Sequence, residues 1–323
     1  MAIIKHTFSK PHHIIIMLSL NIKRPLHIET VKFLNSLAVK GGPDPHEYQA
    51  FVDIVNHLKE HQVDPFREII KDSLTENTLI GHGYVKPYGY PGDFTLIHGI
   101  YRHQINPDPK YSNWDSFFQN QPGAQAVRNR KEYFLNYCEK LQESDRKEVN
   151  ILILGCGPAT DVNEFYTLFP GSHLKFQLID FDQNAIDFAK KQNQNINGSI
   201  EYFRINVLRY KPYKMYDLIW SAGLFDYFKE KHFIYLVNKY IKNLTEEGEY
   251  IIGNFSHVNP TKRLMEVLSD WYLHHRSKYD LIRMAVEAEA DEDQVSVDME
   301  ELGINLFLRI QNSVNGYSAV QKT

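Results

Sequence analysis

The chain has 323 residues, of which 43% are hydrophobic and 24% are charged, so it can bury a large core and is not globally disordered. Its 36 lysines and arginines stand against 40 aspartates and glutamates, and the resulting net charge of −4 argues against a nucleic-acid partner. The two cysteines, Cys138 and Cys156, are too few for a disulfide framework, and no apolar run approaches the roughly 20 residues of a membrane helix, so we expect a cytoplasmic protein without a membrane partner.

The first segments of the chain are a leader and a helical subdomain. Residues 1–25 contain a short apolar stretch with no small-residue cleavage site after it, which indicates a leader that is disordered or packed on the surface. After it, apolar residues recur at helical spacing in three stripes. The pair Asp64-Pro65 is typical of a helix start and separates the second stripe from the third. We therefore predict a helical subdomain over residues 26–123.

A turn-rich stretch, KPYGYPGDF at residues 86–94, interrupts this helical pattern. Its glycines and prolines are typical of tight turns. A helix is predicted again at residues 95–101, then a loop at residues 106–117, where the sequence is NPDPKYSNWDSF, and finally a helix over Ala124–Leu141.

The hydrophobic period changes beyond Glu148. Continuous apolar runs of strand length alternate with amphipathic helical patterns, which predicts a parallel sheet covered on both faces. Residues 294–311 break this alternation and read as two strands joined by a short turn. We therefore predict a Rossmann-like α/β fold over residues 124–323, with a doubly wound seven-stranded sheet that ends in an antiparallel hairpin. The runs before the hairpin are VNILILG, LKFQLID, IEYFRI, YDLIWSA and EYIIGNF.

A glycine-rich loop follows the first predicted strand. Its sequence, GCGPA at residues 155–159, allows the backbone to approach a ligand, and the next helix presents free N–H groups to negative charge. A dinucleotide-binding fingerprint needs a third glycine, and that position is Thr160. The loop therefore predicts a ligand site that lacks the pyrophosphate pattern.

Polar residues stand at the ends of the second and third predicted strands. Asp180 is placed to accept hydrogen bonds from the two hydroxyls of a ribose, whereas Asp182 is also explained as a helix N-cap. After the third strand, Asn206 followed by Val207 can contact the edge and the face of an adenine, with a plain strand end as an equal alternative.

The fourth predicted strand ends in small residues and continues into a polar pair. The segment Ser221–Gly223 is small enough for a ligand to lie against the backbone. Ligands bind at the carboxyl ends of strands in open α/β sheets, so Asp226 and Tyr227 are predicted to project into the same crevice.

Together, these features resemble a known family. The GCGPA loop, the strand-tip Asp180, the polar Asn206, the segment DLIWSAGLFDYF and the terminal hairpin are similar to class I S-adenosylmethionine-dependent methyltransferases over roughly Ala124–Gln311. More narrowly, GYPGDF, AVRNRKEYF and SAGLFDYF resemble the bacterial methyltransferases associated with making 3-hydroxypalmitate methyl ester, an extracellular signal.

The resemblance implies an enzyme that transfers a methyl group from S-adenosyl-L-methionine to a small molecule, with a fatty-acyl or other carboxylate as one acceptor. A hydroxyl or nitrogen of a secondary metabolite, a peptide or a protein is the alternative acceptor. A catalytically silent regulatory protein that binds the cofactor is an alternative of another class, and an NAD-dependent dehydrogenase is disfavoured by Thr160 and the hairpin. The oligomeric state stays open, with a homodimer among the options.

The resemblance also implies roles for single residues. Gly155 and Gly157 are expected to contact the methionine part of the cofactor, and Asp180 its ribose. The full set expected at the cofactor is Gly155, Cys156, Gly157, Pro158, Asp180, Phe181, Asn206, Val207, Ser221, Ala222, Gly223, Tyr88, Asp93 and Arg128. The candidates for catalysis are Asp226, Tyr227, His257 and Tyr90.

The stretch KPYGYPGDF gains a second interpretation upstream of a cofactor crevice. Tyr88, Tyr90 and Asp93 are predicted to close over the cofactor or the acceptor as part of a lid, with a plain turn as the alternative. On the helix that precedes the first strand, Arg128 is favoured over Arg130 as the ligand of a carboxylate.

No metal site is predicted. His274 and His275 are adjacent on a stretch with helical character, so they point in different directions and do not form a chelate. Cys156, inside the glycine loop, is interpreted as a small buried side chain that borders the cofactor.

Overall fold

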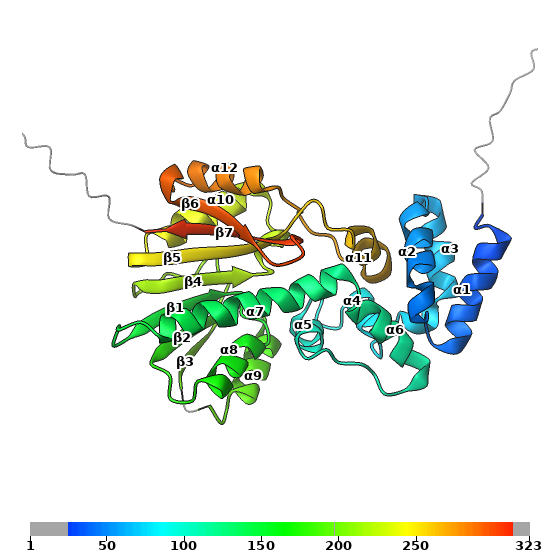
Figure 1. Cartoon of the computed structure of the whole chain (residues 1–323), viewed down its shortest axis with the longest axis horizontal. Coiled ribbons are helices and arrows are strands. Elements are labelled where there is room, and N and C mark those ends of the chain that lie inside the picture. Colours follow the sequence, from blue (N-terminus) through cyan, green and yellow to red (C-terminus); the bar gives the residue numbers. More distant parts are fainter. Residues whose placement is uncertain (1–24, 197, 313–323) are drawn as a thin grey trace, which may run out of the picture.

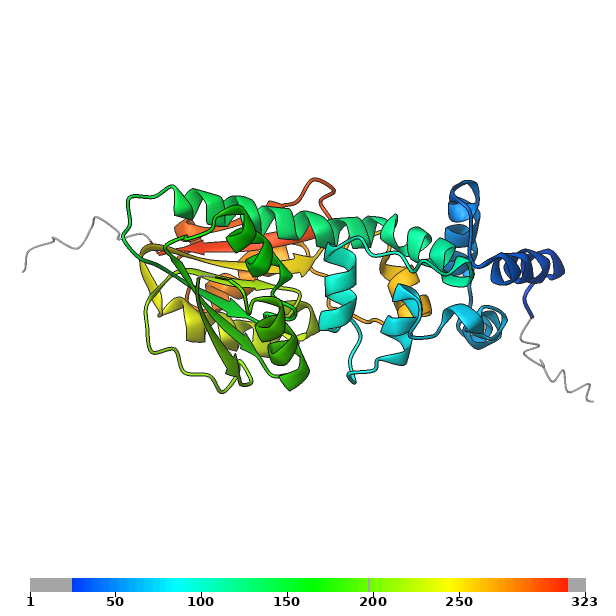
Figure 2. The same cartoon turned by 90° about the horizontal axis from the view of Figure 1, so that it is seen from below.

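The computed structural model describes residues 25–196 and 198–312, so the leader expected at residues 1–25 falls outside the described residues except for Pro25. A sheet region and a helical region lie end to end along the long axis of the molecule (Figure 1), and the second view agrees (Figure 2). The long helix α7 (Pro122–Gln142) runs from one region to the other. The boundary predicted between residues 123 and 124 therefore falls within the first turn of this connecting helix.

The seven-stranded sheet that the sequence predicts is confirmed. Its strand order is β3-β2-β1-β4-β5-β7-β6, with β1 to β5 parallel and β7 antiparallel to both β5 and β6. The strand order reverses between β1 and β4, which is where open α/β sheets bind ligands. The strands are β1 (Val149–Leu154), β2 (Leu174–Asp180), β3 (Ser199–Arg204), β4 (Tyr216–Ala222), β5 (Leu244–Phe255), β6 (Val295–Met299) and β7 (Asn305–Gln311).

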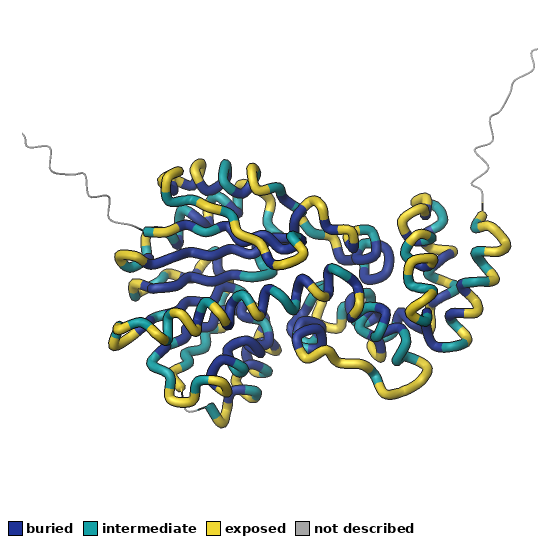
Figure 3. Tube along the Cα trace, viewed as in Figure 1, coloured by how far each residue is buried: buried dark blue, intermediate teal, exposed yellow. Residues whose placement is uncertain are grey.

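Both faces of the sheet are covered, which explains why the central strands read as continuous apolar runs. Along β1, Ile151 and Ile153 belong to one core cluster and Leu152 and Leu154 to the other. The central strands β1, β2, β4, β5 and β7 are mostly buried (Figure 3), whereas the edge strands β3 and β6 are half-buried or exposed. Helices α7, α8 (Thr160–Leu168) and α9 (Gln183–Gln192) cover the first face, and α10 (Glu230–Ile241) and α12 (Lys278–Glu287) cover the second.

The helical region has its own core, in which Phe51 lies 5.6 Å from the ring of Trp114 and 5.1 Å from that of Phe117. Helix α11 (Lys262–Ser269) completes this core with Leu264, Val267 and Leu268, although it follows β5 in the chain. The helices before α7 are α1 (Ile28–Lys40), α2 (Tyr48–His57), α3 (Glu60–Ile69), α4 (Leu79–Val85), α5 (Phe94–Tyr101) and α6 (Pro109–Gln119).

Two local predictions in this region are wrong. Residues 106–117, predicted as a loop, contain most of α6, because the Asp108 carboxylate caps the helix by accepting from the Lys110 N–H at 2.9 Å and Pro109 occupies the first position. In contrast, Pro65 lies inside α3, which begins at Glu60. An Asp-Pro pair therefore starts a helix at Asp108-Pro109 but not at Asp64-Pro65.

Candidate active site

The carboxyl ends of β1, β2 and β4 open onto a cavity of about 370 Å³, within the range of cofactor sites. It lies between the sheet and helix α5, at the reversal of strand order. Thirteen of its lining residues were expected at the site, and they are Tyr90, Gly155, Cys156, Gly157, Pro158, Asp180, Phe181, Asn206, Val207, Ala222, Gly223, Asp226 and Tyr227. The site therefore brings together the strand-tip residues and the expected Tyr90 of KPYGYPGDF, a stretch that also contributes Gly92 and Phe94 to the lining.

The glycine loop turns sharply between β1 and α8. Gly155 and Gly157 have φ angles of 71° and 52°, a region that favours glycine. A Cβ at Gly155 would lie 3.1 Å from the Leu224 side chain, so the loop is also tight on that side. A Cβ at Gly157 would meet no protein atom within 4 Å, so the loop offers an open cradle on the side of the cavity.

Asp180 joins the glycine loop to the tip of β2. One carboxylate oxygen accepts from the Gly157 N–H at 2.9 Å and the other from the Asp182 N–H at 3.0 Å. Burial raises the pKa of this carboxyl, although the backbone donors work against the rise. Asp182 caps α9 by accepting from the Asn184 N–H at 2.9 Å, so its role as a helix cap accounts for it.

Asn206 and Val207 continue the cavity wall after β3. The Asn206 side-chain oxygen accepts from the Leu208 N–H at 2.8 Å, which turns the chain back toward the sheet. The Val207 carbonyl accepts from the Tyr240 hydroxyl at 2.7 Å and is thereby tied to α10.

At the end of β4, the residues of the segment Ser221–Gly223 have different roles. Ala222 and Gly223 line the cavity, whereas the fully buried Ser221 donates its hydroxyl to the Leu154 carbonyl at 2.8 Å and links two strands. Asp226 lines the cavity, is buried, and accepts from the Phe255 N–H at 2.7 Å. Burial raises the pKa of Asp226 to about 6.

Arg130 lies in the cavity and Arg128 does not. The Arg128 guanidinium donates to the side chain and the carbonyl of Gln119 at 2.6 and 2.8 Å, and so holds the end of α6. The buried Arg130 donates to the Tyr101 hydroxyl at 3.2 Å, and a Cβ at Gly223 would lie 2.8 Å from its Nη1. This geometry differs from the expectation for Arg128, because a shift of two residues along α7 changes the face of the helix that a side chain occupies.

Arg130 is the cavity's one lysine, arginine or histidine among the described residues. Within residues 25–196 and 198–312, no carboxylate oxygen lies within 4.0 Å of its guanidinium. Burial opposes the charged form, but Tyr101 and the carboxylates of Asp226 and Asp161 outweigh it and raise the pKa of Arg130. The cavity thus holds a charged guanidinium that is free to receive a carboxylate from a ligand.

The stretch KPYGYPGDF forms part of the cavity wall and makes several contacts with other segments. The Tyr90 hydroxyl donates to the Asp182 carboxylate at 3.0 Å, and its ring packs 5.6 Å from that of Phe181. The Tyr227 hydroxyl donates to the Pro91 carbonyl at 2.8 Å. Lys86, at the other end of the stretch, forms an ion pair with Asp270.

The five other expected residues lie outside the cavity lining. Asp93 caps α5, accepting from the N–H groups of Thr95 and Leu96 at 2.9 and 3.0 Å, and His82 contacts its other oxygen at 2.7 Å. The Tyr88 ring packs 4.6 Å from that of Phe94. His257 is exposed on the turn after β5, and Ser221 and Arg128 have the structural partners given above.

Sequence reasoning did not find several residues of the cavity. Asp161, in the first turn of α8, is buried and has a pKa that burial raises to about 6. A carboxylate directly after a glycine loop is a signal that could have found it. Trp271 comes from the segment after α11, and no local pattern indicates that this segment returns to the cavity.

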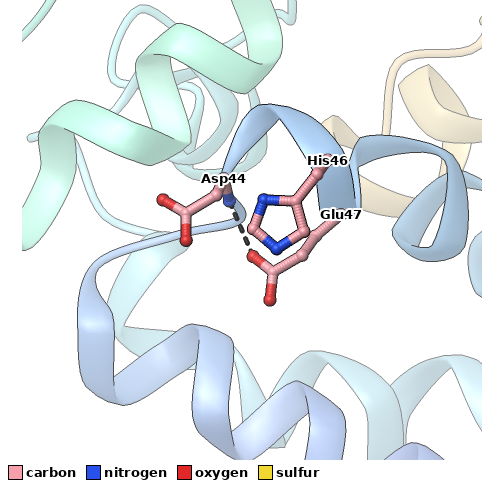
Figure 4. A group of neighbouring side chains, drawn as sticks. All are labelled: Asp44, His46 and Glu47. Atoms are coloured by element: carbon pink, nitrogen blue, oxygen red, sulfur yellow. Dashed lines mark hydrogen bonds between the residues drawn. The ribbon is translucent and has the colours of Figure 1, made fainter.

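A cluster of Asp44, His46 and Glu47 has ligand atoms within 4.8 Å of one another (Figure 4). The Lys40 ammonium lies 2.7 Å from the Asp44 carboxylate and also contacts Glu47. Glu47 accepts from the Asp44 N–H at 2.7 Å as well, which starts a short 3₁₀ helix (Pro45–Glu47). Helix capping and a lysine ion pair therefore account for this cluster.

Comparison with known proteins finds a family match for part of the chain and a solved structure with a similar fold. Residues 145–294 match the family model described as a methyltransferase domain. A crystal structure of a possible exported protein from Bordetella parapertussis has a TM-score of 0.61, with 15% identity, and the superposition covers 88% of this chain and 95% of that one. Since this coverage extends beyond the sheet region, the two proteins share the arrangement of sheet and helices.

Two curated relatives come from Ilyobacter polytropus. Malonyl-[acyl-carrier protein] O-methyltransferase 1 is 29% identical over 115 residues, and malonyl-[acyl-carrier protein] O-methyltransferase 2 is 32% identical over 91 residues. These stretches cover 34% and 27% of this chain, and 41% and 33% of the relatives. The chain thus matches less than half of either relative's length.

The fold and the domain match together identify a methyltransferase domain of the S-adenosylmethionine-dependent class within this chain. The cavity fits that cofactor on three observations: the open cradle at Gly157, the carboxylate of Asp180 at the tip of β2, and the guanidinium of Arg130, which has no ion-pair partner within the described part of the chain. Within this class, the particular likeness of the sequence is to O-methyltransferases. Among the described residues, no helix combines the length and hydropathy needed to cross a membrane.

Proposed function

We propose that this protein is an enzyme that transfers a methyl group from S-adenosylmethionine to a carboxylate oxygen of a small molecule. The observation that carries the proposal is the composition of the cavity, which offers a buried guanidinium and no histidine or lysine among the described residues. A carboxylate acceptor needs no general base, because it is already deprotonated at neutral pH. The names of the two relatives, which describe O-methyltransferases, support the same acceptor chemistry.

In this proposal, the residues at the strand tips hold the cofactor. The loop from Gly155 to Pro158 receives its methionine part, Asp180 accepts from its ribose hydroxyls, and Asn206 with Val207 borders its adenine. When bound, the cofactor supplies an electrophilic methyl group on a sulfonium. The remaining task of the chain is to orient the acceptor and to exclude water.

In this proposal, Arg130 binds a carboxylate, that of the cofactor or that of the acceptor. Its guanidinium can donate two parallel hydrogen bonds to one carboxylate. The Tyr227 hydroxyl is already engaged by Pro91 and by the Trp271 indole, and burial raises its pKa well above the usual value. Tyr227 therefore acts as a positioning residue that joins the lid to the sheet.

Transfer to a hydroxyl or nitrogen of a secondary metabolite, peptide or protein is the second candidate, and Asp226 favours it. Its buried carboxyl has a pKa raised to about 6, so it can accept a proton near neutral pH. The pH dependence separates the two acceptors. A base at Asp226 predicts that kcat/KM rises through about pH 6, whereas a carboxylate acceptor predicts no such rise above the pKa of the acceptor itself.

The test combines calorimetry with product analysis. Wild-type protein is expected to bind S-adenosylmethionine, and Asp180→Ala to bind it at least tenfold more weakly. Asp187→Asn, on the exposed side of α9, is the matched control. Mass spectrometry of mixtures with small carboxylic acids is then expected to show base-labile methyl esters. Cofactor binding without turnover of any acceptor would favour a silent regulatory protein, and no cofactor binding would overturn the proposal.

We also propose that the protein works in the cytoplasm as an enzyme for a freely diffusing acceptor. Cys138 and Cys156 are both buried free thiols, which supports a reducing compartment. Cell fractionation with an antibody tests the location, and recovery of the protein outside the cytoplasm would contradict it.

A further inference from the structure

A second, smaller cavity of about 20 Å³ lies next to the first one, between α5, α7 and α11. The two cavities share two lining residues, Phe255 and Trp271. These rings therefore form the partition between the two spaces. Most other residues of the second cavity are apolar, and they are Ile100, Phe118, Gly123, Ala124, Val127 and Met265.

The polar side chains of the second cavity are already engaged. Gln121 donates to the Phe117 carbonyl at 3.0 Å, and Thr261 accepts from the Gly123 N–H at 2.9 Å. A polar ligand group would therefore find few hydrogen-bond partners there to replace its hydrogen bonds to water, whereas an apolar group has no such bonds to replace. The second cavity suits an apolar extension of whatever the first cavity holds.

The two halves of the partition are held differently. Phe255 belongs to β5, and its N–H donates to the Asp226 carboxylate at 2.7 Å, so it is part of the sheet. Trp271 follows α11 on a loop, where its own N–H donates to the Met265 carbonyl at 3.0 Å. Trp271 is thus the member of the partition that the helical region supplies.

The Trp271 side chain is locked against the lid. Its indole N–H donates to the Tyr227 hydroxyl at 2.8 Å. A Cβ at Gly92 would lie 2.4 Å from the Trp271 ring, so only glycine fits there, and its φ of 68° also favours glycine. Asp270, the preceding residue, forms the ion pair with Lys86 at the start of the lid. The indole can therefore act as a fixed wall.

We propose that Trp271 determines acceptor specificity by closing the acceptor end of the main cavity against the second, apolar cavity. This inference rests on the proposed function, since it assigns the end of the acceptor site. In the wild-type protein, an apolar substituent of the acceptor ends at the indole ring. When the ring is removed, the two cavities join, and acceptors with longer apolar substituents fit.

The test measures binding, so it does not depend on turnover. Straight-chain carboxylic acids of increasing length are titrated into the complex with S-adenosylhomocysteine. For wild type, the dissociation constant is expected to fall roughly fourfold per methylene up to a length limit and then stop falling. Trp271→Ala is expected to extend that limit by at least two methylenes. Trp271→Leu serves the same purpose if the alanine variant does not fold.

Trp271→Phe is the matched control, because it removes the indole N–H but keeps an aromatic wall. It is expected to keep the length limit of the wild type. In the Trp271→Ala background, Ala124→Leu adds side-chain volume to the second cavity from α7 and is expected to restore the shorter limit. An unchanged limit in Trp271→Ala and Trp271→Leu, or an equal extension in Trp271→Phe, would overturn the inference.

The same titrations with straight-chain alcohols separate this inference from the proposed function. A length limit that moves with Trp271 for alcohols, with no binding of acids, would overturn the carboxylate acceptor and support the partition. Ester formation from acids, with a limit that ignores Trp271, would support the acceptor and overturn the partition.

Discussion

The two halves of the cavity are built in different ways. On the half that we propose for the cofactor, the glycine loop, Asp180 and Asn206 each lie at the end of a parallel strand or within two residues of it. On the other half, Tyr90, Arg130 and Trp271 come from a lid, a connecting helix and a loop after α11. The first half depends on local chain direction, whereas the second depends on how the helical region packs against the sheet. We therefore expect the second half to decide which acceptor the proposed enzyme binds.

The largest expected effect tests whether α11 belongs to the helical region. Leu268→Ala leaves a cavity in that core and is expected to lower the free energy of unfolding by about 2–5 kcal/mol, measured by urea denaturation. Hydrogen exchange should rise in α2 and α4, which pack on α11, more than in the strands. Leu178→Ala, in the sheet core, is the matched control and should show the reverse pattern. Equal loss of protection in both regions would contradict the division.

The next effect concerns the pH dependence of stability. The pKa of Asp226 is raised from 3.8 to about 6, so the stability linked to this group is present below about pH 4 and is lost as pH rises through 6. Asp226→Asn can still accept from the Phe255 N–H. It is therefore expected to be more stable than the wild type by up to about 3 kcal/mol at pH 8, and by much less at pH 4. Urea denaturation at the two pH values measures this difference.

A matched control makes that result interpretable. Asp187→Asn removes an exposed carboxylate of α9 and is expected to leave the difference between pH 4 and pH 8 unchanged. The prediction fails if Asp226→Asn and the wild type lose stability in parallel as pH rises.

Variants of Arg130 and Arg128 compare a cavity residue with a structural residue on the same helix, α7. Arg130→Met removes the guanidinium of the cavity and is expected to raise the KM for the cofactor or for the acceptor by about 10–100-fold. Which of the two KM values rises tells which carboxylate Arg130 binds. Arg128→Met loses only the contacts to Gln119, so thermal stability is expected to fall while both KM values stay near those of the wild type. A larger effect on KM from Arg128→Met would contradict the geometry.

The smallest expected effect concerns the lid. Tyr90→Phe removes the hydroxyl that donates to Asp182 and is expected to lower kcat/KM by about 3–10-fold without changing the melting temperature much. Tyr88→Phe is the control, because the Tyr88 ring packs on Phe94 and lies outside the cavity lining. Equal activities of the two variants and the wild type would contradict the lid and leave a plain turn as the role of this stretch.

Asp93 shows that a sequence pattern can single out a polar residue without revealing the role of its side chain. The sequence predicts that Asp93 closes over the cofactor or the acceptor as part of a lid, whereas its carboxylate lies outside the cavity lining, caps α5 and contacts His82. A carboxylate before a helix serves as a cap or as a ligand group, and only its neighbours in space decide between the two. Arg128 and Arg130 pose the same problem, since both lie on one helix and the packing of α7 selects the inward face.

The amino-acid sequence by itself determined the sheet, its terminal hairpin and the strand-tip residues that line the cavity. These features follow from strand-length apolar runs and from residues next to strand ends, where parallel strands bring their carboxyl ends to one edge. Only the tertiary structure decided that α11 joins the helical core, that Arg130 faces the cavity, and that Trp271 forms its wall. These contacts join separate segments of the chain, such as α11 with α2, Arg130 with Gly223, and Trp271 with Gly92. The period of a local hydrophobic pattern carries no information about which distant surfaces pack together.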